Sequence, residues 1–182
     1  MKTAKTPRKP VIVTKAFTLR PIRNSDAADI VKLINDKGIA RNLLSVPHPY
    51  GMKDAREWLR RVSSSRRKKI KTWISFAIDI DGRLVGDISI FKIKGHKAEI
   101  GYWLGRPYWG KGIMTRAVKE IVKFAFNDLG LTRISAYTFI FNKGSQRVLE
   151  KAGFKREGIL RKNVAKGDKL LDEYLFAKIK TK

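Results

Sequence analysis

The sequence predicts one α+β domain in which about four helices flank a mixed, mostly antiparallel central sheet of about seven strands. Two observations predict this class. Residues 72–104 contain three apolar, alternating segments in succession, which is typical of an antiparallel meander. Residues 105–178 then alternate between helical and strand-like patterns, so further helices are expected against the same sheet. The 182 residues and the hydrophobic fraction of 43% suit a single folded domain with a sizeable core.

The N-terminal segment differs from the rest of the chain. Residues 1–15 carry basic but no acidic side chains, so we expect a flexible basic arm there and the folded domain over residues 16–182. The apolar run Val11-Ile-Val is too short for a signal peptide, and no run of about 18 apolar residues could span a membrane. The absence of cysteine excludes disulfides, thiolate metal sites and a cysteine nucleophile. We therefore expect a cytoplasmic protein.

The first strand and the first helices follow the arm. Phe17–Ile22 alternates as a strand does, and Pro21 indicates an edge position or an early end. Asn24–Asp29 offers a helix cap ahead of apolar residues at helical spacing. A broken helical region comes next, interrupted by Val46–Tyr50, and another helix is expected to begin near Lys53. Its apolar positions are Ala55, Trp58, Leu59 and Val62.

The meander in the middle of the chain is the strongest β signal. Strands over 72–80 and 83–91 are joined by Asp81-Gly82, a dipeptide that suits a type I′ turn. A second turn near Gly95 leads to a strand over 98–104.

The last elements have clear boundaries. A helix is expected over about 113–128, with Gly130 just past its end. The elements expected after it are a strand over 133–139, a helix over 144–152 stopped by Gly153, and strands over about 154–163 and 169–178.

The charge is strongly unbalanced. The chain has 41 Lys and Arg against 16 Asp and Glu, a net charge of +25. The basic residues gather in the arm, between Arg60 and Lys71, and in the tail after Lys178. Such a surface indicates a polyanionic partner such as RNA or a ribosome. A generally basic proteome or an ordinary solvated surface would give the same composition, and both alternatives stay open.

The stretch Glu99–Ala117 carries the main chemical signal. It combines a half-buried strand, a turn with Gly110 and Gly112, and the start of an amphipathic helix. Backbone N–H groups and the helix dipole at such a turn attract anions, and glycines let a diphosphate approach closely. The amides expected to bind it belong to Trp109, Gly110, Lys111, Gly112, Ile113 and Met114.

Several short motifs together resemble the GNAT family of acetyl-CoA-dependent N-acetyltransferases. They are Leu19-Arg-Pro-Ile-Arg, Tyr102-Trp-Leu, Trp109-Gly-Lys-Gly, Asn142-Lys-Gly-Ser and Lys151-Ala-Gly-Phe. The resemblance spans about residues 17–178 and is greatest to the branch that acetylates the N-termini of ribosomal proteins. One position departs from the family pattern, because Pro107 stands where the phosphate turn usually begins with Gln or Arg.

The resemblance implies a GNAT fold, acetyl-CoA as co-substrate, and the following site. The backbone of Tyr102, Trp103 and Leu104 would pair with the pantetheine arm, and an N–H there would stabilise the oxyanion. Asn142 and Ser145 would lie beside the cofactor, although Asn142 is also a good helix cap. No set of His, Asp and Glu has metal-ligand spacing, so no metal is expected.

The resemblance also implies catalytic residues. Glu99 is the candidate general base, acting through a water, and Ser145 would position or protonate the leaving thiolate. An ordinary ion pair between Glu99 and a neighbouring lysine is the alternative. Tyr137 and Tyr174 are other candidate proton donors, and His48 lies in the region that lines the acceptor side in this family.

The acceptor implied by the resemblance is a primary amine, above all the N-terminal α-amine of a ribosomal protein, which attacks directly in a ternary complex. A small amine such as an aminoglycoside or polyamine is the alternative, and it would need a locally acidic pocket near Glu57, Asp79 or Asp87. A non-catalytic nucleic-acid-binding module is a third hypothesis. No membrane partner is expected, and monomer and homodimer both remain open.

Overall fold

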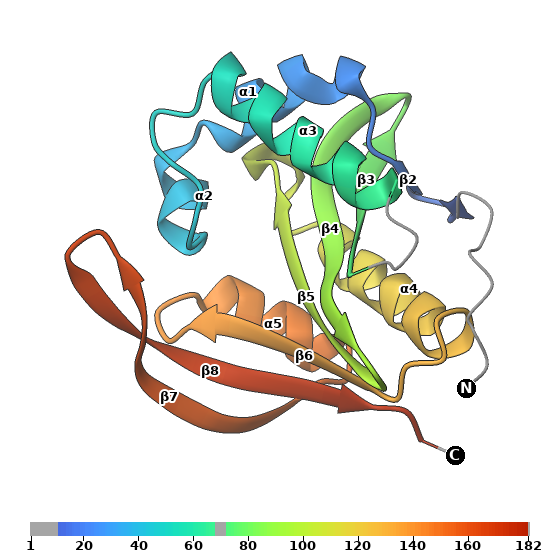
Figure 1. Cartoon of the computed structure of the whole chain (residues 1–182), viewed down its shortest axis with the longest axis vertical. Helices are drawn as coiled ribbons and strands as arrows, with labels where there is room; N and C mark the ends of the chain where they lie inside the picture. The colour runs from blue at the N-terminus through green and yellow to red at the C-terminus, as the bar shows by residue number, and fades with distance from the viewer. Residues whose placement is uncertain (1–10, 68–71, 182) are drawn as a thin grey trace.

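The computed structural model describes residues 11–67 and 72–181. Within them, eight strands form one sheet in the order β1-β2-β3-β4-β5-β6-β8-β7, and five α-helices pack on its two faces (Figure 1). The predicted α+β class and mostly antiparallel sheet are confirmed, with one short strand and one short helix more than expected. In the same residues, no helix is long and apolar enough to cross a membrane.

The first strands form one edge of the sheet. β1 (Ile12–Val13) pairs antiparallel with β2 (Thr18–Pro21), which ends at its proline as the sequence predicts. Two residues of the expected arm are therefore in a strand. The expectation of a flexible arm over residues 1–10 lies outside the described residues.

Three helices cover one face of the sheet. After the short 3-10 turn η1 (Asn24–Asp26) come α1 (Ala27–Ile34), α2 (Lys37–Asn42) and α3 (Met52–Arg67). Their apolar side chains pack on the sheet through a cluster that includes Ile30, Ile34, Ala55, Leu59 and Trp103. The serine run near the end of α3 stays helical, and the Ser65 hydroxyl donates to the Trp73 carbonyl at 2.9 Å. Residues 68–71 of the predicted basic cluster lie outside the described residues.

The meander forms the middle of the sheet. β3 (Trp73–Ile80) and β4 (Arg83–Lys94) meet at the predicted turn, where Asp81 and Gly82 have φ values of 52° and 79°. Both angles are positive, as a type I′ turn requires. β5 (Lys97–Leu104) pairs antiparallel with β4.

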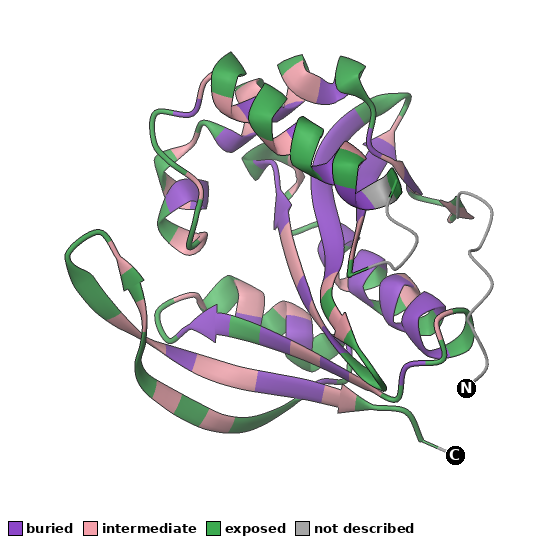
Figure 2. Cartoon of the chain, viewed as in Figure 1, coloured by how far each residue is buried: buried purple, intermediate pink, exposed green. Residues whose placement is uncertain are grey.

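The second face carries the larger part of the core. α4 (Ile113–Asn127) packs there, with many of its residues buried (Figure 2). Its buried side chains belong to one core cluster with Ile88, Ile90 and Ile100 of the sheet. The chain then forms β6 (Arg133–Phe139), α5 (Lys143–Lys151), β7 (Lys155–Lys166) and β8 (Lys169–Ile179).

A buried ion-pair network ties β2 to β3 and η1. The Arg20 guanidinium donates to Asp79 at 2.5 Å and to Asp26 at 2.8 and 2.9 Å, and all three side chains are buried. The hydrogen bond from Arg20 to Asp26 is the largest cause of a raised Arg20 pKa. Asp79, which the sequence offered as a possible pocket acid, is therefore a structural partner of Arg20.

The sheet opens between β5 and β6. These strands run parallel, and in the described sheet their pairing covers Lys97–Glu99 against Arg133–Ser135. Beyond that point β5 continues alongside β4 while β6 turns away with β8 (Figure 1). The backbone edge of Ile100–Leu104 that faces β6 thus has no strand partner in the described sheet, and we call the space between the diverging strands the opening.

Candidate functional site

The glycine turn closes one end of the opening. A 3-10 turn, η2 (Arg106–Tyr108), follows β5 and leads to Gly110 and Gly112, whose φ values are 74° and 70°. A Cβ at Gly110 would meet nothing within 4 Å, so the left-handed backbone rather than crowding accounts for the glycine there.

The N-terminus of α4 is open to an anion. Gly112 is its N-cap, and among the described residues no side chain caps it. The first N–H groups of the helix are therefore available to a ligand, and the helix dipole adds positive potential. Lys111 lies beside them, with its ammonium 5.7 Å from the centre of the Tyr108 ring.

These two features fit coenzyme A. An unpaired strand edge suits the extended, amide-containing pantetheine arm, and the glycine turn suits the pyrophosphate. The indole N–H of Trp109 donates to the Leu104 carbonyl at 2.7 Å, which fixes the turn onto the end of β5. Arg106 instead points to Asp36, with 3.4 Å between nitrogen and oxygen on an exposed surface.

The opposite side of the opening comes from α5. Asn142 caps this helix, because its side-chain oxygen accepts from the Ser145 N–H at 3.1 Å. The Ser145 hydroxyl lies 2.9 Å from the Tyr102 hydroxyl, which also donates to the Ser145 carbonyl at 3.3 Å. Burial raises the pKa of Tyr102 well above its usual range. The sequence analysis selected both residues but did not foresee that they bridge β5 and α5.

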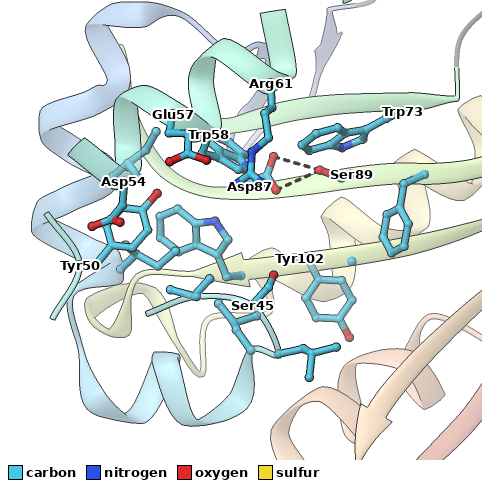
Figure 3. A pocket seen from close by; sticks show the side chains of 18 of the residues that line it. Ser45, Tyr50, Asp54, Glu57, Trp58, Arg61, Trp73, Asp87, Ser89 and Tyr102 are labelled. Carbon is cyan, nitrogen blue, oxygen red and sulfur yellow. Dashed lines mark hydrogen bonds between the residues drawn. The ribbon is translucent and has the colours of Figure 1, made fainter. Parts of the chain in front are cut away.

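A pocket of about 580 Å³ adjoins the opening on the side of the sheet that carries α3. Gly101, Tyr102 and Trp103 of β5 line it, so it reaches the unpaired strand edge. Figure 3 shows that side chains of α3 face those of β4 and β5 across it. Its polar and aromatic lining consists of Ser45, Tyr50, Asp54, Glu57, Trp58, Arg61, Thr72, Trp73, Asp87, Ser89, Phe91, Lys92, Tyr102 and Trp103.

α3 supplies the charged rim of this pocket. Asp54, Glu57, Trp58 and Arg61 are spaced i, i+3, i+4 and i+7, so they occupy one face of the helix. The helix is predicted from its apolar positions, and the shared face of these four side chains was not predicted.

Asp87 lies in the pocket wall on β4. It is 5% exposed and stands opposite Trp103 in the antiparallel register. The Ser89 hydroxyl donates to its carboxyl at 3.1 Å, and the Ser75 hydroxyl lies 2.6 Å from that of Ser89. Burial raises the pKa of Asp87 to about 8, opposed by the hydrogen bond from Ser89. Of the acidic positions proposed from the sequence, Glu57 and Asp87 line the pocket and Asp79 does not.

Glu99 occupies a different position. It shares a sheet face with Asp87 but pairs with Phe91, at the end of β5 that is still bonded to β6. Its carboxylate forms an ion pair with Lys92 at 3.1 Å, the alternative considered from the sequence. Glu99 is not among the residues that line the described pocket.

The other candidate side chains are dispersed. The Tyr137 side chain is exposed, and the Tyr174 ring packs under Arg156, whose guanidinium carbon lies 4.7 Å from the ring centre. His48 lines a second, smaller cavity together with Lys166 at the tip of the β7–β8 hairpin. The Lys166 ammonium donates to the carbonyls of Ala40, Arg41 and Leu43 at the end of α2. In the described part of the chain, no group of His, Asp and Glu could hold a metal ion.

Comparisons with known proteins agree with this geometry. A family model described as an acetyltransferase (GNAT) domain matches residues 16–155. The chain is 54% identical to "Probable N-acetyltransferase YjcK" of Bacillus subtilis over 87 residues, 46% of this chain and 48% of that protein. It is 31% identical over 154 residues to "Putative ribosomal N-acetyltransferase YdaF" of the same organism, covering 82% of this chain and 83% of the other.

A solved structure shows the same fold. RimJ from Mycobacterium smegmatis in complex with CoA-disulfide superposes with a TM-score of 0.82 at 24% identity, covering 90% of this chain and 81% of that one.

Proposed function

Because the chain belongs to the GNAT family of acetyl-CoA-dependent N-acetyltransferases, we propose that it acetylates the N-terminal α-amine of a protein, specifically of a ribosomal protein. The observation that carries this proposal is the pocket beside the unpaired edge of β5. It brings an acceptor to the strand that would hold the thioester. The relative YdaF, whose name describes a ribosomal N-acetyltransferase, supports the choice of acceptor.

The donor side is assigned to backbone groups. When bound, acetyl-CoA supplies an activated acetyl thioester. We assign its pyrophosphate to the N–H groups from Trp109 to Met114, and its pantetheine arm to the free edge of Tyr102–Leu104. An N–H of that edge is positioned to donate to the carbonyl oxygen as negative charge develops on it. The Ser145 hydroxyl, held by Tyr102, is assigned to the sulfur.

The pKa of the acceptor favours an α-amine. At pH 7, removing a proton from an α-amine costs about 1.4 kcal/mol, whereas a lysine side chain costs about 4.6 kcal/mol. A single carboxylate base suffices to deprotonate an α-amine and is poorly matched to deprotonating a lysine side chain. An N-terminus is therefore the better acceptor for a site whose candidate bases are carboxyls.

A small cationic amine is the second candidate. Its support is the three carboxyl groups of Asp54, Glu57 and Asp87 in the pocket lining, which also contains Arg61 and Lys92. An aminoglycoside or a polyamine would find carboxylates there. The non-catalytic alternative has less support, because a nucleic-acid-binding module needs neither a splayed strand nor an open glycine turn.

The excess of basic residues is assigned to the ribosome. We propose that the basic surface, including the expected arm over residues 1–15, guides the protein to ribosomal RNA. Co-sedimentation with ribosomes should then weaken steeply as salt rises, because phosphate contacts release counterions. Association that does not change between low and moderate salt would contradict this role.

The enzymatic proposal is tested by acetyl-CoA turnover. Release of the free thiol is followed with peptides that differ in their first residue, the same peptides with blocked N-termini, lysine peptides, aminoglycosides and polyamines. We expect turnover with free N-termini, no turnover with blocked ones, and an acetyl group located on the α-amine by mass spectrometry. Turnover with the small amines alone would refute the protein acceptor, and no turnover with any amine would refute the proposed function.

A further inference from the structure

We propose that Asp87 is the group that takes the proton from the acceptor ammonium, in place of Glu99. The inference rests on the proposed function, because it concerns the same transfer of an acetyl group to an amine.

Asp87 lies at the junction of the acceptor pocket and the donor strand. It belongs to β4, the neighbour of β5, and stands directly across from Trp103 in the register. Directly opposed residues of an antiparallel pair have Cβ atoms about 4.5–5.5 Å apart. The carboxyl therefore lies beside Trp103, a residue of the strand assigned to the thioester, and it lines the pocket assigned to the amine (Figure 3).

The carboxyl is buried without a cation. The buried carboxylates Asp26 and Asp79 both form ion pairs with Arg20. Asp87 differs, because among the described residues it forms no ion pair and its hydrogen-bond donor is the neutral Ser89. A buried carboxylate without an ion-pair partner is costly to keep charged. An incoming ammonium would supply such a partner in the pocket, which Arg61 and Lys92 also line.

A pair of serines holds this carboxyl in place. Because Ser89 gives its single hydroxyl proton to Asp87, the short contact between the two serines must use the Ser75 proton. The chain Ser75–Ser89–Asp87 therefore runs in one direction along the sheet face. It orients the carboxyl while leaving acceptor lone pairs for an ammonium.

Besides Asp87, the pocket lining contains both acidic and basic groups. α3 presents Asp54, Glu57 and Arg61, β4 presents Lys92, and the remaining titratable neighbours are the hydroxyls of Tyr50 and Tyr102. Lys92 is already paired with Glu99. Asp54 and Glu57 lie at positions where they attract a cation toward Asp87.

Glu99 lacks these properties. Its ion pair with Lys92 supplies the positive charge that Asp87 is missing. A Phe91 ring carbon would lie 3.0 Å from a Cβ at Gly101, so this ring covers the strand between Glu99 and the pocket end of β5.

The proton and electron balance is complete without another reactant. The ammonium gives one proton to the Asp87 carboxylate, and the free amine then forms a carbon–nitrogen bond to the acetyl carbonyl carbon. The carbon–sulfur bond breaks, and the thiolate takes the second proton from the nitrogen. Asp87 returns its proton to water, so each turnover yields an amide, a thiol and one proton. Because burial raises the pKa of Asp87 to about 8, the first proton moves between groups of similar pKa.

The test compares Asp87→Asn with Glu99→Gln on the best peptide acceptor, with the half-buried Glu120→Gln of α4 as a matched control for loss of a carboxylate. We expect kcat/KM to fall about 100-fold or more in Asp87→Asn, the usual scale of general-base catalysis, and much less in Glu99→Gln. Acetyl-CoA affinity, measured by calorimetry, should be retained in all three variants and shows that each is folded.

The pH profile gives a second readout. If a bound ammonium gives its proton to Asp87, kcat/KM should vary with pH as a bell with its maximum near pH 8. In Asp87→Asn, kcat/KM should instead rise with pH to a plateau. Ser89→Ala removes a donor that lowers the Asp87 pKa, so it should move the acid limb to higher pH. A bell that survives in Asp87→Asn, or a larger loss in Glu99→Gln than in Asp87→Asn, would overturn the inference while leaving the proposed function intact. Failure of the wild-type protein to acetylate any amine would instead refute the proposed function, and the role of Asp87 with it.

Discussion

Replacing Asp87 with asparagine should stabilise the protein while it impairs acetyl transfer. The carboxyl titrates near 3.8 in the unfolded chain and near 8 in the folded one. Between these values the folded state binds a proton that the unfolded state has released, so the stability of the wild type falls as pH rises from about 4 to about 8. Asparagine has a similar shape and does not titrate, so it removes this dependence.

The magnitude follows from the size of the pKa shift. Each pKa unit corresponds to about 1.36 kcal/mol, so the penalty is about 2 kcal/mol at pH 5 and about 4 kcal/mol at pH 7. Above pH 8 it levels off near 6 kcal/mol. The difference in unfolding free energy between Asp87→Asn and the wild type should therefore grow by about 1.4 kcal/mol per pH unit from pH 5 to pH 8.

Urea denaturation at constant ionic strength, followed by circular dichroism at pH 5, 6, 7 and 8, measures this difference. Comparing the two proteins cancels contributions that they share, including those of the surface charges. A difference that is constant across this range would refute the reasoning, because it would show that Asp87 is ionised in the folded protein.

Three further predictions concern the glycine turn, the buried arginine and the hairpin tip. Gly112→Ala should lose about 1 kcal/mol of stability from its left-handed backbone and weaken acetyl-CoA binding in calorimetry. Gly82→Ala, at a φ of 79° far from the site, should lose as much stability with unchanged acetyl-CoA affinity. Equal acetyl-CoA affinity in the two variants would contradict the assignment of the pyrophosphate to the glycine turn. Arg20→Met should lower the unfolding free energy, measured by urea denaturation, by about 3–5 kcal/mol because it leaves two buried carboxylates without a cation. A loss of less than about 1 kcal/mol would contradict this role of Arg20. Lys166→Met should speed hydrogen exchange in α2, whose last carbonyls the ammonium binds, whereas Lys169→Met should not. Equal exchange in these two variants would show that the hairpin tip does not brace α2.

Local signals predicted most of the elements. Asp81-Gly82 predicts the hairpin because few other dipeptides adopt two positive φ angles, and the helical spacing from Ile113 onward predicts α4 within a residue or two. The glycine turn and its helix could be predicted for the same reason, because their chemistry is contained within a few neighbouring residues.

Features that depend on distant residues could not be predicted. The network of Arg20 with Asp79 joins residues 59 apart, and the contact of Tyr102 with Ser145 joins residues 43 apart. Nothing in the local sequence indicates which positions meet at such distances. A weaker signal for Asp87 was present, since Asp87 and Ser89 are the polar residues of an otherwise apolar stretch and fall on the same face of a strand.

The division of the sheet at β5 has an evolutionary consequence. Every residue that lines the acceptor pocket comes from the chain up to Trp103, whereas the glycine turn, α4 and α5 follow it. Apart from Tyr102 and Trp103, which belong to both sets, the residues proposed to bind the two reactants therefore lie in successive parts of one polypeptide. Substitutions in the earlier part can alter the accepted amine without disturbing the groups that hold the donor. A chimera that joins the chain up to Leu104 of one such enzyme to the remainder of another should inherit its choice of amine from the first parent.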